Sequence, residues 1–225
     1  MHLFTYFVII FISLSSFSFG QAGEIQIRFI GNCGLHLTDG ETDIYVDFPY
    51  KSGAYSYMTF DESELENVKE NAIFIFTHKH KDHFSGKNMR RVLKEKGGKK
   101  FTPWRSKKLK KHAETIPDFE IEIFKTKHTF SLRHRSYLIT WHGKRIYLSG
   151  DTEHPETIAN IKNIDMAFVP YWIIREAKKK DLSIDAKKIG IYHIATEQIP
   201  SLKEHYASPE NVILMAEQGK SIELK

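Results

Sequence analysis

The stretch 72-AIFIFTHKHKDH-83 joins an apolar run to a cluster of histidines. Residues 72–76 are continuously apolar and bounded by polar residues, which predicts a strand buried on both faces. The residues that follow such a strand are held at its rigid end. His78 and His80 are two positions apart, so in an extended backbone their side chains point to the same side. Both imidazoles can then face one cation.

Asp82 and His83 complete this cluster after the chain turns. We expect them to face a second cation close to the first. Neutral imidazole and carboxylate are ligands that suit zinc, and manganese or iron are alternatives. The sequence therefore predicts a metal site directly after the buried strand.

The spacing H-x-H-x-D-H resembles the signature of the metallo-β-lactamase superfamily of metal-dependent hydrolases. Three later residues match the order that this family shows: His128 after an expected strand at 119–127, Asp151 in the turn LSGDT, and His193 after an expected strand at 189–192. The turn at 31–34 and the strand end at 46–49 are similar to the family's opening hairpins. The resemblance covers residues 24–195, and the short chain is most similar to the ascorbate-phosphate-lactonase-like branch.

The resemblance implies an α/β fold, the four-layer αββα sandwich of the metallo-β-lactamase type. It also implies seven ligands for two divalent metal ions, with zinc favoured over manganese or iron. His78, His80 and His128 would bind the first ion, Asp82, His83 and His193 the second, and Asp151 would bridge both. Asp82 and Asp151 are then the catalytic carboxylates. Two cations would lower the pKa of a bridging water and supply hydroxide for attack on a carbonyl carbon or a phosphorus.

Several residues near these positions allow two interpretations. His134 is an alternative to His128, although His128 directly follows a strand as the other expected ligands do, and His154 either supports the site or lies on the surface. We expect Cys33 to be a small buried hydrophobe rather than a nucleophile. We expect Asp47 to cap a strand end, with contact to the metal-site loop as the alternative. The aromatic loop at 50–58 is a candidate border of the substrate cleft.

Composition and charge limit the remaining choices. The chain has 225 residues, of which 41% are hydrophobic and 27% charged, so one globular domain over residues 23–225 is expected and extensive disorder is excluded. A single cysteine excludes an internal disulfide and a cysteine-based zinc cage. The formal net charge is +5.

The positive charge is concentrated in residues 87–111, which hold twelve Lys or Arg and one acid. This segment is either a solvated face or a surface for an anionic substrate, a phospholipid head group or nucleic acid. We favour a small anionic substrate or a membrane surface over nucleic acid, and the sequence does not indicate an oligomeric state. Trp104 within the segment either packs or contacts a ligand.

The first twenty residues contain no Asp, Glu, Lys or Arg and include the apolar run 3–12. Small residues precede Gln21, which is typical of a signal peptide cleaved near residues 20–22. We therefore expect an exported protein, periplasmic or secreted, with an uncleaved membrane anchor as the alternative.

The function expected from these observations is hydrolysis of an ester, lactone or phosphoester in a small anionic substrate. A nuclease or phosphodiesterase of the same fold, a zinc β-lactamase and a non-enzymatic metal-binding protein are the alternatives. Among the remaining elements we expect a strand at 24–30, where the sequence EIQIRFI alternates, and further strands at 136–141, 145–149 and 166–170. We also expect a helix at 61–70, a helix at 186–188 before the strand at 189–193, and a helix near 208–217.

Overall fold

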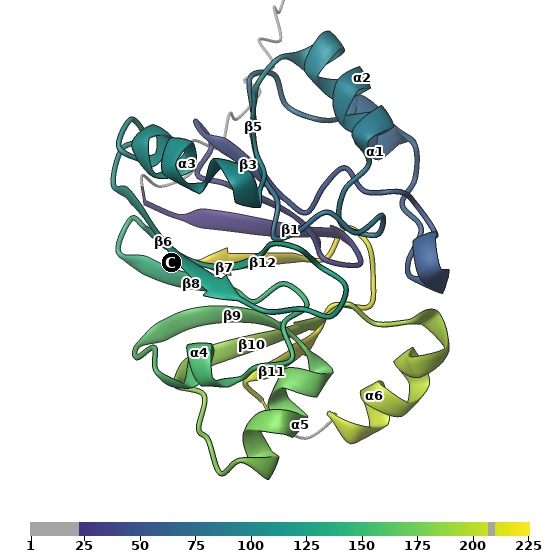
Figure 1. Ribbon diagram of the computed structural model, residues 1–225, viewed down its shortest axis with the longest axis vertical. Coiled ribbons are helices and arrows are strands. Elements are labelled where there is room, and N and C mark those ends of the chain that lie inside the picture. The colour runs from purple at the N-terminus through teal and green to yellow at the C-terminus, as the bar shows by residue number, and fades with distance from the viewer. Residues whose placement is uncertain (1–22, 207–209) are drawn as a thin grey trace, which may run out of the picture.

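The computed structural model describes residues 23–206 and 210–225, which form two six-stranded sheets packed face to face (Figure 1). The first sheet has the order β12-β1-β2-β3-β4-β5, with β12 at Ser221–Leu224, β1 at Ile25–Gly31, β2 at Gly34–Thr38, β3 at Asp43–Val46, β4 at Ile73–Ile75 and β5 at Lys99–Phe101. The second has the order β11-β10-β9-β8-β7-β6, with β11 at Val212–Leu214, β10 at Ala186–Tyr192, β9 at Ile164–Pro170, β8 at Lys144–Leu148, β7 at His134–Trp141 and β6 at Phe119–Thr126. The expected signal peptide at 1–20 and its cleavage site lie outside the described residues.

Helices cover the outer faces of both sheets, which gives the four-layer αββα sandwich expected from the sequence (Figure 1). The helices are α1 at Ser63–Glu66, α2 at Gly86–Lys96, α3 at Ser106–Ala113, α4 at Glu156–Ala159, α5 at Tyr171–Lys179 and α6 at Ile199–His205, with short 3-10 turns at Ala54–Ser56, Pro103–Arg105 and Thr196–Gln198. Within the described part of the chain, no helix has the length and apolar character needed to cross a membrane.

The core between the sheets follows from the two-residue period of the strands. In β1, Ile25, Ile27 and Phe29 are fully buried while Gln26 faces outward. These residues meet apolar side chains of the second sheet, such as Ile139 and Phe168, in one hydrophobic cluster. Burial of such side chains contributes about 1.5–3 kcal/mol each relative to their exposed state, so this cluster holds the two sheets together.

Helix α3 closes one end of the space between the sheets. Its Leu109 and Ala113 are buried in the same cluster as Phe119 of β6. Helices α1 and α2 pack instead on the outer face of the first sheet, through Leu65, Met89 and other residues of a second cluster. The expected helix at 61–70 is shorter than predicted and is present only as α1.

Two expectations for the C-terminal third are wrong. The expected helix at 186–188 is the start of strand β10, because Ala186 pairs in parallel with Ile164 of β9. The described part of the expected helix near 208–217 contains strand β11, which pairs with β10 from Val212 onward. Pairing with a neighbouring strand outweighs local helix propensity in both places. Helices α5 and α6 and strand β12 were not anticipated.

Strand direction brings the chemistry-bearing residues to one edge. Strands β3 and β4 run parallel, as do β8, β9 and β10, and β6 runs in the same direction as β8 through two antiparallel pairings. The carboxyl ends of parallel strands meet at a single edge of a sheet. The loops after β4, β6, β8 and β10 therefore converge where the two sheets meet.

Candidate metal centre

The seven side chains expected as ligands converge at this edge, each in the loop after a strand. His78, His80, Asp82 and His83 follow β4, and His128, Asp151 and His193 follow β6, β8 and β10. The ligand atoms of His78, His80 and His128 lie within 4.8 Å of one another. So do those of His83, Asp151 and His193, together with the sulfur of Cys33. The residues thus form two adjacent groups.

Asp151 lies between the two groups. Its Oδ2 atom is 2.9 Å from Nε2 of His83 and 2.8 Å from Nε2 of His193. The same oxygen is 3.7 Å from Nε2 of His78 and 3.8 Å from Nε2 of His128. One carboxylate oxygen therefore faces two histidines of each group.

Asp82 belongs to the group that contains His83 and His193. Its Oδ2 is 3.1 Å from Nε2 of His193 and 3.5 Å from Nε2 of His83. The side-chain amide of Asn32 donates a hydrogen bond of 2.8 Å to the Asp82 carbonyl oxygen, and the Asn32 carbonyl accepts one of 3.1 Å from the backbone N–H of His193. The turn between β1 and β2 thus fixes Asp82 and His193 relative to each other.

Hydrogen bonds to the far ring nitrogens orient several of these imidazoles. Nδ1 of His83 donates to Oδ2 of Asp47 at 2.9 Å, and Nδ1 of His128 donates to Oε1 of Glu153 at 2.9 Å. Nε2 of His80 lies 3.3 Å from the carbonyl oxygen of Phe130. Such partners fix the tautomer of a metal-binding histidine and leave its other nitrogen free. In each of these imidazoles, the ring nitrogen that is left for a metal ion is the one that faces the cluster.

The environment of the cluster fits divalent cations. His78 is fully buried and its Nε2 has no hydrogen-bond partner, and the same is true of Oδ1 of Asp82, which is almost fully buried. Unpaired buried polar atoms are costly unless another group satisfies them. Imidazole nitrogens and carboxylate oxygens grouped in this way are the donor set that zinc, iron and manganese accept.

The charges within the cluster depend on one another. Burial alone would raise the pKa of Asp151, but the facing His193 and His83 hold it well below the ordinary range. Burial alone would lower the pKa of His83, yet the carboxylates of Asp151 and Asp47 raise it well above the usual value. Burial lowers the pKa of His78, and the nearby charge of His83 lowers it further. In the metal-free protein, Asp151 and Asp47 thus favour a proton on His83. A cation bound between His83 and Asp151 would replace the positive charge of that proton.

His134 lies beside the cluster and supports it. Its Nε2 accepts a hydrogen bond of 3.0 Å from the Asp151 backbone N–H, and its Nδ1 is 2.7 Å from the Thr126 hydroxyl. Both ring nitrogens are used, so this residue has none left for a metal. His128 is the better candidate ligand, as its position after a strand suggested. His154 is exposed and lies 4.0 Å from Glu156, outside the cluster.

Gly150 is required by the close approach of His134 to the turn. Its φ is +59°, and a Cβ there would lie 2.6 Å from Nε2 of His134 and 2.8 Å from Cβ of Thr77. No L side chain fits without displacing one of these residues. The glycine before Asp151 is therefore needed for the position of the carboxylate.

Asp47 contacts the loop that carries the histidines, which was the alternative to the strand-end cap that we favoured. Its Oδ1 accepts a hydrogen bond of 2.7 Å from the Thr77 backbone N–H, and its Oδ2 accepts bonds from the Thr77 hydroxyl at 2.6 Å and from His83. The signal was present in the sequence, because Asp47 follows one strand as the histidines follow its neighbour. Its backbone is also left-handed, with φ of 47°. Non-glycine residues in that region are found at functional sites more often than elsewhere.

The surroundings of Cys33 and His193 were not fully anticipated. Cys33 is buried as expected, but its sulfur lies 3.8 Å from Oδ1 of Asp151. The rings of Tyr57 and Trp172 flank His193 with centroid distances of 4.1 and 5.2 Å. Tyr57 comes from the aromatic loop that we expected at the cleft, whereas Tyr50 of that loop is buried. No feature of the sequence indicates Trp172 or Glu153.

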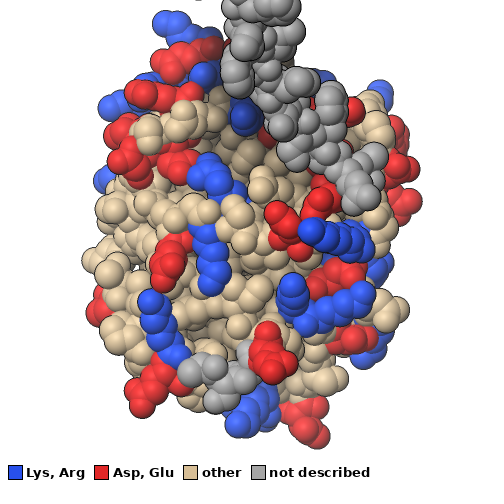
Figure 2. Space-filling model, turned by 180° about the vertical axis from the view of Figure 1, so that it is seen from behind, with Lys and Arg blue, Asp and Glu red and all other residues tan. Residues whose placement is uncertain are grey.

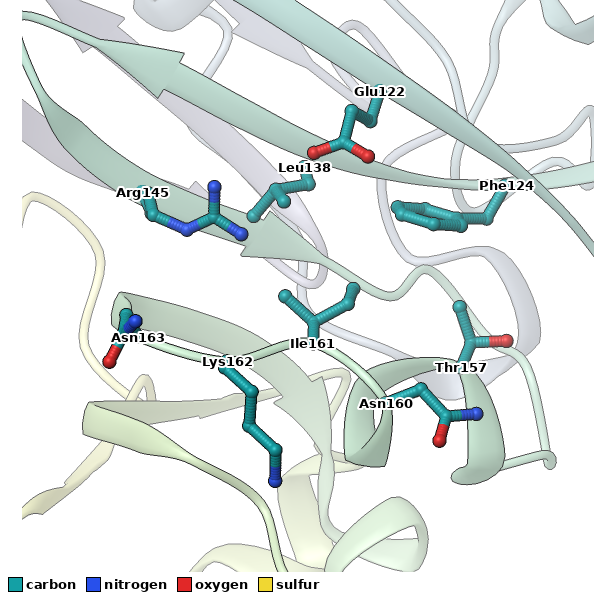
Figure 3. Close-up of a pocket in the computed structure, with 9 residues that line it drawn as sticks. All are labelled: Glu122, Phe124, Leu138, Arg145, Thr157, Asn160, Ile161, Lys162 and Asn163. Atoms are coloured by element: carbon teal, nitrogen blue, oxygen red, sulfur yellow. The ribbon is translucent and has the colours of Figure 1, made fainter.

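A separate hollow of about 710 Å³ lies on the outer face of the second sheet, beside α4 (Figure 3). Phe124 and Leu138 reach into it from the strands, and Asn160 borders it on the opposite side. None of the seven clustered side chains lines this hollow. We therefore place the candidate chemistry at the strand ends and not here.

The same fold occurs in solved structures. A metallo hydrolase from Ignicoccus hospitalis, Igni18, matches with a TM-score of 0.66 and 16% identity over 90% of this chain and 99% of its own. The chain has the metallo-β-lactamase fold. The metallo-β-lactamase fold protein YhfI from Bacillus subtilis matches with a TM-score of 0.56 and 13% identity over 89% of this chain and 100% of its own.

A candidate metal-dependent hydrolase from Parabacteroides distasonis is similar with a TM-score of 0.58 and 24% identity, over 86% of this chain and 94% of its own. No family model and no curated protein matches the sequence. At these sequence identities the matches show only a shared fold. The chemistry of the site is therefore inferred from this chain's own residues.

Proposed function

We propose that the chain is an exported, dinuclear metal-dependent hydrolase that cleaves an ester, lactone or phosphoester in a small anionic substrate. The observation that carries the proposal is the position of Asp151, whose Oδ2 faces two histidines of each ligand group within 3.8 Å. A single ion would not need six further ligands arranged around a shared carboxylate. His78, His80 and His128 would hold one cation, and Asp82, His83 and His193 the other.

Bound cations would act as Lewis acids and lower the pKa of a water molecule toward neutrality. The protein's own part is to hold the ligands in place and to shape the substrate side. Asp47 and Glu153 keep His83 and His128 in the tautomer that binds a cation. Burial, together with the charges of Asp151 and Asp82, raises the pKa of Tyr57 to about 12. Tyr57 therefore keeps its proton at neutral pH and can donate a hydrogen bond to a substrate oxygen.

An anionic substrate is supported by basic side chains around the cluster. Lys79 lies between two of the proposed ligands and is exposed, and Arg133 and Arg135 flank His134. Positive charge beside a concave site raises the local concentration of anions and their association rate. The support for export comes from the N-terminal sequence alone.

The test is turnover by purified protein on a panel of p-nitrophenyl esters, lactones and bis-p-nitrophenyl phosphate, before and after chelation. We expect hydrolysis of at least one class, loss of that activity with EDTA, and recovery with zinc, manganese or iron. His80→Ala should remove activity and lower metal content, while His154→Ala, a histidine outside the cluster, serves as the matched control and should change neither.

The alternatives give different results in the same assay. Hydrolysis of nitrocefin alone would favour a zinc β-lactamase, and cleavage of oligonucleotides alone would favour a nuclease. Activity that survives complete removal of metal would contradict the proposal. Protein that binds two metal ions and turns over no substrate would instead be a metal-binding protein.

A further inference from the structure

The loop 127–133, which follows β6 and carries His128, exposes two large apolar side chains. Phe130 is 97% and Leu132 is 94% accessible. Phe130 has a left-handed backbone with φ of 59°, and the Ser131 backbone N–H donates to the His128 carbonyl at 3.1 Å. A tight turn thus presents the phenyl ring to solvent in a backbone conformation that L residues rarely adopt. We name Phe130 and Leu132 the apolar tip.

Cations and a half-exposed tryptophan lie next to the apolar tip. The guanidinium of Arg133 is 5.6 Å from the ring of Trp104, and Nζ of Lys79 is 5.1 Å from the same ring. Trp104 is 45% accessible. Lys100 lies 5.6 Å from the Phe84 ring, over which Lys79 also lies at 5.5 Å. Aromatic rings and cations are therefore interleaved on this face.

The cations of this face lack acidic partners. Among residues 23–206 and 210–225, no carboxylate lies within 4 Å of the charged groups of Lys79, Arg90, Lys100, Arg105 and Arg133, which we name the basic rim. Burial and the neighbouring charges of Arg105, Lys79 and Arg90 together lower the pKa of Lys100, as expected for cations that crowd one another. By contrast, the face shown in Figure 2 has acidic and basic side chains interspersed.

We propose that the apolar tip and the basic rim dock the protein on a membrane that contains anionic phospholipid. Exposed Phe and Leu side chains surrounded by unpaired Lys and Arg match the two layers of such a surface, in which acyl chains lie beneath phosphate groups. A tryptophan at the edge of the apolar residues matches the interfacial zone. Nucleic acid would use the cations and Trp104, but it offers no apolar layer for Leu132.

Docking in this way would turn the metal centre toward the lipid surface. The carbonyl of Phe130 lies 3.3 Å from Nε2 of His80, so the tip and the ligand cluster are held by one short segment. This consequence depends on the proposed function, whereas the docking itself does not. Membrane binding and turnover can therefore fail independently.

The experiment uses the full-length protein and vesicles of phosphatidylcholine with or without phosphatidylglycerol. We expect more sedimentation with the anionic vesicles than with phosphatidylcholine alone, and we expect high salt to reduce this difference. Replacing the tip in the double variant F130S/L132S should lower the partition coefficient about tenfold or more, because burial of one large apolar side chain is worth about tenfold in an equilibrium constant. Metal content and the circular dichroism spectrum should stay unchanged.

Charge variants provide matched controls. R105E/R133E should weaken vesicle binding by at least as much as the loss of the apolar tip. K178E/K188E makes the same change in net charge, but at exposed lysines of α5 and β10, and it should have only a small effect on binding. Every variant keeps the apolar N-terminal sequence, so differences between them report on this surface alone.

Trp104 gives a direct readout of contact. Brominated lipids should quench its fluorescence in the bound protein. W104F should lose the part of the quenching that belongs to Trp104, since Trp141 is fully buried, and W172F measures the contribution of the partly buried Trp172. Equal binding of wild type, F130S/L132S and R105E/R133E, or binding without quenching of Trp104, would overturn the proposal. Salt-sensitive binding to a single-stranded oligonucleotide with no binding to vesicles would assign the surface to nucleic acid instead.

Discussion

Asp47 contributes to the site without facing the cluster. Its carboxylate joins the end of β4 to His83 through three hydrogen bonds. An asparagine here would keep only one acceptor oxygen in place of two, so either the Thr77 backbone N–H or the His83 ring would lose its acceptor. Partners of this kind commonly change metal affinity by about 10- to 100-fold when mutated.

Asp47→Asn should therefore lower zinc affinity by about 10- to 100-fold while the fold persists. Asp43→Asn is the matched control, because Asp43 begins the strand that Asp47 follows and pairs with His36 at 2.7 Å, away from the cluster. Competition with a chromophoric chelator measures both variants. Equal affinities for Asp47→Asn and wild type would show that His83 does not need this acceptor.

His134 makes the metal-free protein sensitive to acid. Burial lowers its pKa to about 3, whereas the unfolded chain has the ordinary value near 6.5. Between these values the unfolded state binds more protons, so the free energy of unfolding falls as the pH drops from about 6.5 toward 3. The predicted loss from this residue is of the order of a few kcal/mol.

His134→Gln should flatten that dependence in protein held in EDTA, since the amide does not titrate. Urea denaturation at several pH values between 7 and 4 measures the slope. A variant whose stability falls with acid as steeply as that of the wild type would assign the sensitivity to other groups.

The thiol of Cys33 should be inert in the folded protein. Burial raises its pKa well above the ordinary value, and the neighbouring carboxylates of Asp151, Asp47 and Asp82 raise it further. Thiolate reagents should therefore label the metal-free protein only after denaturation. Rapid labelling without urea would mean that the turn at residues 31–34 opens.

At the scale of elements, the sequence predicted most of the strands and the places where ligands follow them. Period-two alternation and short apolar runs were enough for β1, β4 and β6. Helix and strand could not be told apart for residues 186–188, because pairing with β9 decides the structure there. Asp47 follows β3, which runs parallel to β4. Because the carboxyl ends of parallel strands meet, this could have placed Asp47 beside the histidines that follow β4. Trp172 and Glu153 approach the cluster only through tertiary packing, so local patterns carried no information about them.

Gly98 shows how one position fixes an element. It has φ of +99°, and a Cβ there would lie 2.3 Å from the Ala72 carbonyl oxygen, where α2 turns into β5. Gly98→Ala should lower the free energy of unfolding by about 3 kcal/mol or more, because strain and overlap add. Gly143→Ala is the control, with φ of +74° and open space, and should cost about 1 kcal/mol. Similar costs measured in urea for the two variants would show that the overlap relaxes.

At the scale of the whole molecule, the cluster joins the two sheets. His78, His80, Asp82 and His83 belong to the first sheet's loops, and His128, Asp151 and His193 to those of the second. A bound cation held by both would stabilise the packing of one sheet on the other. Any ligand that binds only the folded state raises stability, by about 4 kcal/mol at a thousandfold excess over Kd.

Zinc should therefore raise the melting temperature of the chelated protein, and EDTA should reverse the change. Asp151→Ala should lose most of this response, because the carboxylate shared by the two groups is gone. A melting temperature that does not depend on zinc would mean that metal does not link the sheets.

The proposed dinuclear centre depends on two ligand groups around one shared carboxylate. Metal content measured by mass spectrometry on purified protein, after loading with excess zinc and desalting, tests it most directly. We expect about two zinc ions per chain for the wild type, about one for His128→Ala, and less than one for Asp151→Ala. One zinc ion or none in the wild type, or an unchanged content in Asp151→Ala, would contradict the account.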